Sequence, residues 1–181
     1  MLPTHYPSLD DVLQHSAFVA HAIRAMDTQT VSPSEALQRL IQASWTRADI
    51  EREIEALTTV DALSMGLRSL RRALMVSLIA RNATGLIDYY EVVRIMSDFA
   101  EVAVSQTVKV HARELATRFG VPYGFSGNPQ DLLVVGMGKL GGRELNVSSD
   151  IDLIFLFDEN GETRETPEFP NIRRTIEVQE F

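Results

Sequence analysis

The chain has 181 residues, of which 45% are apolar, so it is long enough for one ordinary domain or two small ones with a buried core. The absence of cysteine excludes disulfides, thiolate metal sites and cysteine nucleophiles. A formal net charge of −8 and a pI near 5.0 disfavour binding to a nucleic-acid backbone, so we expect no nucleic-acid partner and, at most, a small nucleotide ligand.

The start of the chain carries no targeting signal that we can identify. The residues MLPTHYPSLDD lack the basic and apolar regions of a signal peptide. Apolar stretches such as ALMVSLIA are too short to span a bilayer. Together with the lack of cysteine, these features predict a cytoplasmic protein with no membrane association.

Helical periodicity begins near residue 9. The stretch SLDDVLQHSAFVAHAIRAM predicts one helix behind a Ser8 cap. A second helix is expected behind Ser32, with Pro33 as its first residue and Glu35 as an early acid. A short charged helix is expected behind Thr46.

Two longer helices are expected over 60–81 and 86–118, and the second is apolar around much of its circumference. It is therefore expected to be the hub of a helical bundle that occupies residues 1–119. Three sets of side chains have a simple structural interpretation. Three aromatic residues are expected in the core, and four arginines on the helix at 60–81 are expected to form surface ion pairs. The four histidines are expected at the surface. These sets are Tyr89, Tyr90 and Phe99; Arg68, Arg71, Arg72 and Arg81; and His5, His15, His21 and His111.

Glycine and proline residues mark residues 120–130 as a connector, and the pattern changes after it. DLLVVGMG predicts a buried strand, residues 139–146 a short helix, and DIDLIFLF a second strand that is apolar on both faces after its first three residues. The acids that follow are expected in a solvated loop. The overall prediction is an α+β protein, with a helical bundle followed by the start of an α/β domain at 131–181.

The glycine cluster GMGKLGG allows two interpretations. Gly136, Gly138 and Gly141 have the spacing of a dinucleotide-binding turn, and Asp158 follows Gly136 by 22 positions, near the separation of a ribose-binding acid. A Walker A interpretation fails because no G-K-[ST] follows four residues after the first glycine. The dinucleotide interpretation has its own difficulty, because it would bury acids at the start of the second strand at a cost of several kcal/mol.

Those acids are Asp150 and Asp152, which we call the D-x-D pair. On a strand they would point to the same side, with α-carbons roughly 6.5 Å apart. Such a pair repels itself unless a cation lies between the carboxylates. Oxygen ligands combined with substrate phosphates suit Mg²⁺, or Mn²⁺ in its place. The alternative is a pair of acids at a strand edge in water.

The turn at Gly136 and Gly138 then fits a phosphate, because backbone N–H groups and the start of the following helix can face it. Lys139 adds a positive charge, or is an ordinary exposed lysine. Ser148 and Ser149 either contribute to the same site or cap the turn before the strand. Glycine at both 141 and 142 weakens the helix and suggests that another element approaches its backbone closely.

A glycine turn, a short helix and D-x-D on the next strand resemble the nucleotidyltransferase superfamily that includes DNA polymerase beta. The longer string GMGKLGGRELNVSSDIDLIF resembles the signature of the bacterial bifunctional glutamine synthetase adenylyltransferase/adenylyl-removing enzymes. That family carries the motif twice, and its second copy has tyrosine where Met137 stands and glycine-tyrosine in place of Asn146 and Val147. The likeness is therefore to the first copy, with weaker likeness in LRSLRRALMVSLIARN and VPYG.

The resemblance implies a mixed-sheet nucleotidyltransferase domain that removes AMP from a tyrosine of glutamine synthetase, with phosphate and ADP, or ATP in the reverse direction, as small substrates. It implies that Asp150 and Asp152 are catalytic metal ligands, and that Gly136, Gly138, Lys139, Ser148 and Ser149 line the phosphate or nucleotide site. Glutamine synthetase and the PII regulatory protein are the implied partners. The family also has a third carboxylate on a later strand that this sequence does not contain, so we expect the 181-residue chain alone to be inactive.

Two alternatives remain open at this point. The helical region could mainly dock glutamine synthetase or PII, with the part that carries the D-x-D pair inert. The chain could also belong to an unrelated nucleotidyltransferase, which the extended motif argues against.

Overall fold

The computed structural model describes residues 6–25 and 31–181. The helices of the described part, in chain order, are α1 (Leu9–His15), α2 (Ala17–Ala25), α3 (Pro33–Gln42), α4 (Arg47–Glu55), α5 (Val60–Ala83), α6 (Tyr89–Phe119) and α7 (Gly138–Gly141). The strands are β1 (Val121–Gly124), β2 (Leu133–Gly136), β3 (Leu153–Leu156) and β4 (Gly161–Arg164), and a 3-10 turn, η1, spans Val178–Glu180. Within the described residues no helix is long and apolar enough to cross a membrane.

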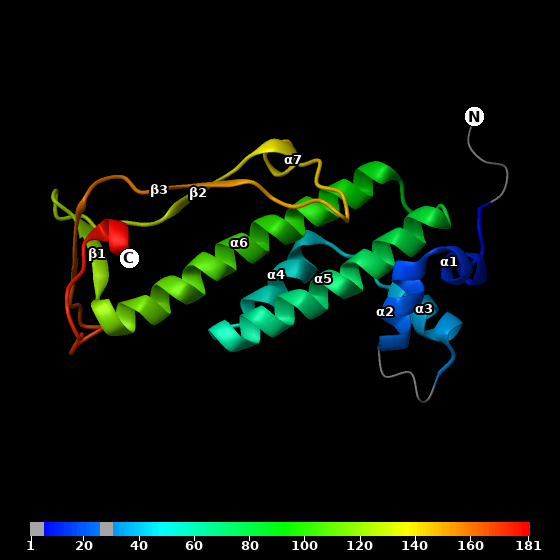
Figure 1. The fold of residues 1–181 in the computed structure, drawn as a ribbon, viewed down its shortest axis with the longest axis horizontal. Coiled ribbons are helices and arrows are strands. Elements are labelled where there is room, and N and C mark those ends of the chain that lie inside the picture. Colours follow the sequence, from blue (N-terminus) through cyan, green and yellow to red (C-terminus); the bar gives the residue numbers. More distant parts are fainter. Residues whose placement is uncertain (1–5, 26–30) are drawn as a thin grey trace.

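The two long helices α5 and α6 lie side by side as the centre of the molecule (Figure 1). Helix α4 packs on α6, and α1, α2 and α3 gather around one end of α5. The β2–α7–β3 segment runs along α6, and β1, β4 and η1 lie near the end of α6 (Figure 1). The molecule is α+β, as predicted.

The expected cap residues stand at the starts of α3 and α4. The Glu35 N–H donates to the Ser32 hydroxyl over 3.2 Å, and the Ser32 N–H donates back to the Glu35 carboxylate over 2.9 Å. Thr46 and Asp49 form the same reciprocal pair in front of α4. These capping boxes satisfy donors that a helix start leaves free, which is why the local sequence predicts the two boundaries correctly.

The single helix predicted near the N-terminus is wrong, because it divides at Ser16. The backbone of Ser16 is extended (φ −104°, ψ 96°), and its N–H ends α1 by donating to the Val12 carbonyl. Its hydroxyl accepts the N–H of Val19 over 3.3 Å in the first turn of α2. A serine that bonds to nearby backbone competes with helix continuation, and this accounts for the break.

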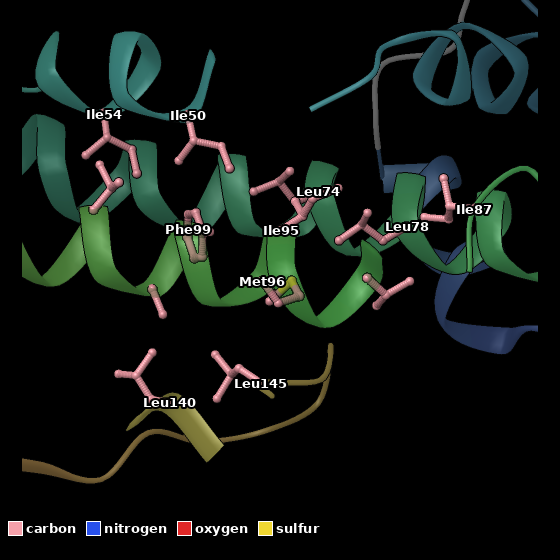
Figure 2. Packing of buried hydrophobic residues seen from close by; sticks show 13 residues of the cluster. Ile50, Ile54, Leu74, Leu78, Ile87, Ile95, Met96, Phe99, Leu140 and Leu145 are labelled. Carbon is pink, nitrogen blue, oxygen red and sulfur yellow. The ribbon is translucent and has the colours of Figure 1, made fainter. Parts of the chain in front are cut away.

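Helix α6 is the hub of the main core, as predicted. Figure 2 shows Ile50 and Ile54 of α4 and Leu74 of α5 toward one side of α6, with Leu140 and Leu145 approaching it from the opposite side. All five belong to one buried cluster, which joins the bundle to the α7 segment. A second cluster unites the α1–α3 helices with α5.

The burial of individual aromatic and histidine side chains agrees with the predictions only in part. Phe99 is buried as predicted, but Tyr89 and Tyr90 are 57% and 79% exposed. They open the first turn of α6, where side chains tilt back toward the helix start and away from the core. His15, His21 and His111 are exposed as predicted, and His5 lies outside the described residues.

The prediction of ion pairs for the arginines of α5 is wrong within the described residues, since none of the four is in a salt bridge there. Arg81 instead donates to the carbonyls of Ile41 and Ala43 over 2.6 and 3.3 Å. The last carbonyls of a helix have no hydrogen-bond partner within that helix. The Arg81 guanidinium supplies the missing donor at the end of α3. Arg68 bonds within its own helix, to Ser64.

The segment expected to be only a connector contains β1, and the acidic stretch expected to be a loop contains β4. The two strands pair antiparallel, with Val121 opposite Arg164 and Gly124 opposite Gly161. The N–H of Thr163, which is fully buried, also donates to the carbonyl of Ile176 over 2.9 Å. Both strands form because residues about forty positions apart pair with each other. Local sequence patterns carry no information about such distant pairing.

Strands β2 and β3 form a second antiparallel sheet, and no mixed sheet occurs within the described residues. The prediction that DLLVVGMG is buried is wrong, because Leu133 and Val135 of β2 are 54% and 42% exposed. Phe155 of the paired strand β3 is 57% exposed. The reason is that the two-stranded sheet packs on the helical core near Leu153, at its α7 end, and the described residues place no second layer over the rest of it. The β2–β3 sheet therefore presents an open apolar surface.

Candidate nucleotidyltransferase site

The glycine turn joins the end of β2 to the start of α7. Gly136 pairs with Leu153 as the last register position of the sheet. The N–H of Met137 then donates to the carbonyl of Asp152 over 2.9 Å, which extends the ladder by one step. Gly138 follows with φ +53°, a left-handed conformation that favours glycine. The turn and the second acid of the D-x-D pair are thus adjacent in space.

Close approach of backbone explains why small residues stand here. A Cβ added at Gly141 would lie 2.6 Å from the carbonyl oxygen of Gly136, so nothing larger than glycine fits without a shift. A Cβ added at Gly138 would lie 3.5 Å from a carboxylate oxygen of Asp152. The predicted close approach at Gly141 is confirmed, and the carboxylate of Asp152 lies directly against the turn.

Helix α7 is shorter than the predicted helix over 139–146. It ends at Gly141, and Arg143 has φ +56°. The N–H of Arg143 donates to Leu140 and the N–H of Glu144 donates to Lys139, over 3.0 and 2.7 Å. These two bonds form a Schellman motif, in which the left-handed position is usually glycine.

The arginine at this left-handed position forms ion pairs with α6. Its guanidinium contacts Asp98 at 2.5 Å and also pairs with Glu101. Those ion pairs raise the pKa of Arg143, with the hydrogen bond to Asp98 as the largest cause. A left-handed backbone at a residue other than glycine costs on the order of 1–3 kcal/mol, so the surrounding structure must hold it.

The start of α7 has no side-chain cap, since Met137 makes no capping hydrogen bond. The described helices α1, α3, α4, α5 and α6 are each capped by a side chain. The first N–H groups of a helix have no partner within it, and here no side chain replaces that partner. The N–H groups that follow Met137 remain available to an acceptor such as a phosphate oxygen.

The segment before β3 is organised by Asn146, a residue whose role the sequence pattern did not reveal. Its side-chain oxygen accepts the N–H and hydroxyl of Ser148, both over 3.1 Å, and the hydroxyl of Ser149 over 2.9 Å. Lys139 also approaches Ser149, with Nζ 3.4 Å from the hydroxyl. An asparagine two residues before a serine is the signal that would have found this turn. The two serines are therefore within the same local network as Lys139.

Asp150 and Asp152 both precede β3 and are exposed. Neither carboxylate has a hydrogen bond or an ion pair within the described part of the chain, so both are free to act as oxygen ligands. Asp150 lies beyond the hydrogen-bonded ladder, so its position on the same side as Asp152 remains a prediction. In residues 6–25 and 31–181 no third acid or histidine completes a metal-binding group.

The donor set nevertheless fits Mg²⁺ in chemistry. Two unpaired carboxylates supply hard oxygen ligands, and a phosphate held at the uncapped turn would bring more oxygen atoms to the same place. The ion typically keeps waters and takes few protein ligands when it binds with a phosphate substrate. The observation that supports this fit is the carboxylate of Asp152 beside Gly138.

Comparison with known proteins gives one consistent result. The family model described as glutamate-ammonia ligase adenylyltransferase matches residues 6–181. The bifunctional glutamine synthetase adenylyltransferase/adenylyl-removing enzyme of Ralstonia nicotianae is 42% identical over 158 residues, which cover 86% of this chain and 16% of that protein. The protein of the same name from Burkholderia mallei is 38% identical over 93% of this chain and 18% of its own length. That of Chromobacterium violaceum is 51% identical over 60% of this chain and 12% of its own length.

This chain therefore spans less than a fifth of the length of these curated relatives. The family model, in contrast, covers nearly all of it. Both the helical bundle and the glycine turn with its D-x-D pair fall within that match. The extent of the match and the identity of the relatives show that the chain belongs to the glutamate-ammonia ligase adenylyltransferase family.

Proposed function

We propose that this chain is part of an enzyme that controls glutamine synthetase by removing AMP from a tyrosine, with phosphate as the attacking group. The observation that carries the proposal is the free carboxylate of Asp152 lying against an uncapped glycine turn. This arrangement brings an anion-binding backbone and a cation-binding side chain together, as nucleotidyl transfer requires. The names of the relatives supply the protein substrate and the adenylyl group.

In the proposed reaction an oxygen of inorganic phosphate attacks the phosphorus of the tyrosyl-AMP. A new phosphorus–oxygen bond gives ADP, and the bond to the tyrosine oxygen breaks. The tyrosine oxygen keeps the electron pair and takes up, through water, the proton that the phosphate gives up on becoming the outer phosphate of ADP. No oxidant or further reactant is needed.

The chain contributes orientation and charge to this step. Main-chain N–H groups at Gly138 and Lys139 bind phosphate oxygens, and the ammonium group of Lys139 adds a positive charge beside them. Ser149, held by Asn146 near Lys139, fixes the lysine end of the site. Holding the phosphate in line with the bond that breaks removes much of the entropy cost of bringing the reactants together.

Asp150 and Asp152 are the proposed ligands of Mg²⁺ or Mn²⁺. When bound, the ion offsets negative charge on the phosphate oxygens. Transfer of AMP from ATP to the tyrosine runs in the opposite direction, with pyrophosphate rather than phosphate as the second product, and would use the same residues. PII as a regulator and the cytoplasm as the location are further parts of the proposal. The first rests on the family likeness, and the second on the lack of cysteine and of a recognisable targeting signal.

A chimera tests the proposal and its direction together. The matching segment of the Ralstonia nicotianae relative, 42% identical, is replaced by this chain. We expect the chimera to release ADP from adenylylated glutamine synthetase when phosphate and Mg²⁺ are present, and the Asp152→Asn chimera to lose that release. If both chimeras instead add AMP from ATP normally and neither removes it, the direction proposed here is wrong.

A further inference from the structure

The α7 segment is attached to α6 at three positions. The side chains of Leu140 and Leu145 are buried in the main core, as Figure 2 shows. The N–H of Leu145 donates to the hydroxyl of Ser97 over 3.2 Å. Between these two leucines, Arg143 reaches Asp98 and Glu101. The two polar attachments, at Ser97 and at Asp98 with Glu101, fall within about one turn of α6.

Asp98 is the centre of the polar attachment. Its side chain is 4% exposed and contacts Arg47 of α4 at 3.2 Å, Arg94 of α6 at 3.5 Å and Arg143 at 2.5 Å. A carboxylate removed from water needs such partners, because burying an uncompensated charge is unfavourable. Arg47 and Arg94 belong to the helical bundle itself. Within the described residues, Arg143 is the partner that comes from the segment carrying the glycine turn.

The identity of residue 143 adds a second observation. Its backbone is left-handed and occupies the position where glycine ends a helix without strain. A glycine there would preserve the two main-chain bonds to Leu140 and Lys139. An arginine at this position is therefore explained by its side chain, whose contacts with Asp98 and Glu101 hold the strained backbone.

The orientation of α7 is transmitted directly to the turn. The N–H of Gly141 donates to the carbonyl of Met137 over 3.1 Å. A Cβ added at Gly136 would lie 3.0 Å from the side chain of Leu140. Because α7 is a single turn of helix, tilting it at Arg143 moves the N–H groups that follow Met137.

From these contacts we propose that Asp98 is a positioning residue, which acts through Arg143 to set the orientation of the glycine turn for phosphate and nucleotide. This inference rests on the proposed function, because the turn has a ligand to orient only in that reaction. It goes further by assigning a role to an acid on a helix of the bundle, 38 residues before the turn begins. The bundle then orients the site as well as supporting it.

The deciding variant is Arg143→Gly, measured in the 181-residue chain. It removes the ion pairs of residue 143 and, at the same time, relieves the strain of its left-handed backbone. A purely local role of residue 143 and a role through Asp98 therefore predict opposite results. If residue 143 matters only for the local turn, hydrogen exchange of the amides of residues 139–146 slows or stays the same. If Asp98 positions the turn through Arg143, that exchange rises at least tenfold.

Binding provides the readout that a purely structural role would not change. Calorimetry with ADP and Mg²⁺ should give a dissociation constant at least tenfold higher for Arg143→Gly than for the original chain. Arg143→Lys, which keeps one charge but not the two-pronged contact, should restore part of the affinity. Asn171→Gly relieves the other left-handed residue of the described part, and Arg113→Gln removes an exposed α6 arginine 4.0 Å from Glu168; both should bind as the original chain does.

Three results would overturn the inference or its basis, each separately. Unchanged exchange in Arg143→Gly refutes the attachment through Asp98. Faster exchange with unchanged ADP affinity refutes its role in binding. A failure of the original chain to bind ADP with Mg²⁺, with exchange still faster in the variant, refutes the proposed function and leaves the attachment itself supported.

Discussion

The N–H of Met137 donates to the carbonyl of Asp152 over 2.9 Å, so the first residue after β2 and the second acid of the D-x-D pair are hydrogen-bonded neighbours. Both groups belong to the main chain. A change in the side chain at 152 therefore leaves the contact in place, and variants there test the chemistry of the site with little effect on the fold.

Substitution of Asp152 by asparagine is expected to reduce affinity for ADP with Mg²⁺ by about tenfold or more, equivalent to about 1.4 kcal/mol. A neutral amide is a poorer ligand for Mg²⁺ than a carboxylate. The melting temperature should not change, because the side chain has no hydrogen bond or ion pair in the described structure. Calorimetry measures the affinity, with Asp158→Asn beyond β3 as the control; equal affinities for Asp152→Asn and the original chain would argue against the site.

Gly138→Ala should weaken the same binding and also lower stability by about 1 kcal/mol. The positive φ of +53° disfavours alanine, and the new methyl group would lie 3.5 Å from the Asp152 carboxylate. Gly127→Ala is a matched control, since Gly127 has φ +85° and nothing within 4 Å of an added Cβ. We expect both variants to lose stability in urea unfolding but only Gly138→Ala to lose ADP affinity. Parallel loss of affinity in both would show that strain alone explains the effect.

The start of α4 should contribute stability that is lost in acid. Hydrogen bonding from the Thr46 hydroxyl, then from Arg52 and the Thr46 N–H, lowers the pKa of Asp49 from 3.8 to about 2. Because the pKa is lower in the folded state, this stabilisation is present above pH 3.8 and is lost as the pH falls toward about 2. Melting temperatures of Asp49→Asn should therefore fall less steeply between pH 4 and 2 than those of the original chain. Glu53→Gln, on the exposed side of the same helix, should keep the original slope.

The parts of the fold that were predictable depend on neighbours in sequence. The caps at Ser32 and Thr46 act within three residues, and the apolar circumference of α6 is visible in its own residues. The glycine turn after β2, with Gly138 in a left-handed conformation, also follows from the motif itself. In each case, the information and the structure that it specifies lie in one short segment.

The parts that were missed depend on distant partners. Arg143 ends α7 with ion pairs to residues 42 and 45 positions away, and a sequence pattern gives no hint of that pairing. The pairing of β1 with β4 is equally distant along the chain. Burial of β2 was predicted from its apolar residues alone, but burial requires a second layer, and Leu133 has none in the described structure.

The contrast between the two leucines around the glycine turn gives a further prediction. Leu140 of α7 is 6% exposed and packs in the main core, whereas Leu133 of β2 is 54% exposed. We expect Leu140→Ala to lower the free energy of unfolding by about 2–4 kcal/mol, because it removes buried methyl groups and leaves a cavity beside α6. Urea unfolding measures this through the fluorescence of Trp45, the one tryptophan of the sequence, which packs against the same cluster.

Leu133→Ala serves as the matched control for that measurement, because it deletes the same atoms from a more exposed site. Its effect should stay below about 1 kcal/mol, since the side chain loses little contact with other apolar atoms. Leu140→Ala should also speed hydrogen exchange at residues 139–146, because one of the three attachments to α6 is lost with it. Equal destabilisation by the two variants would contradict the structure, since it would mean either that the β2 face is covered or that α7 does not pack on α6.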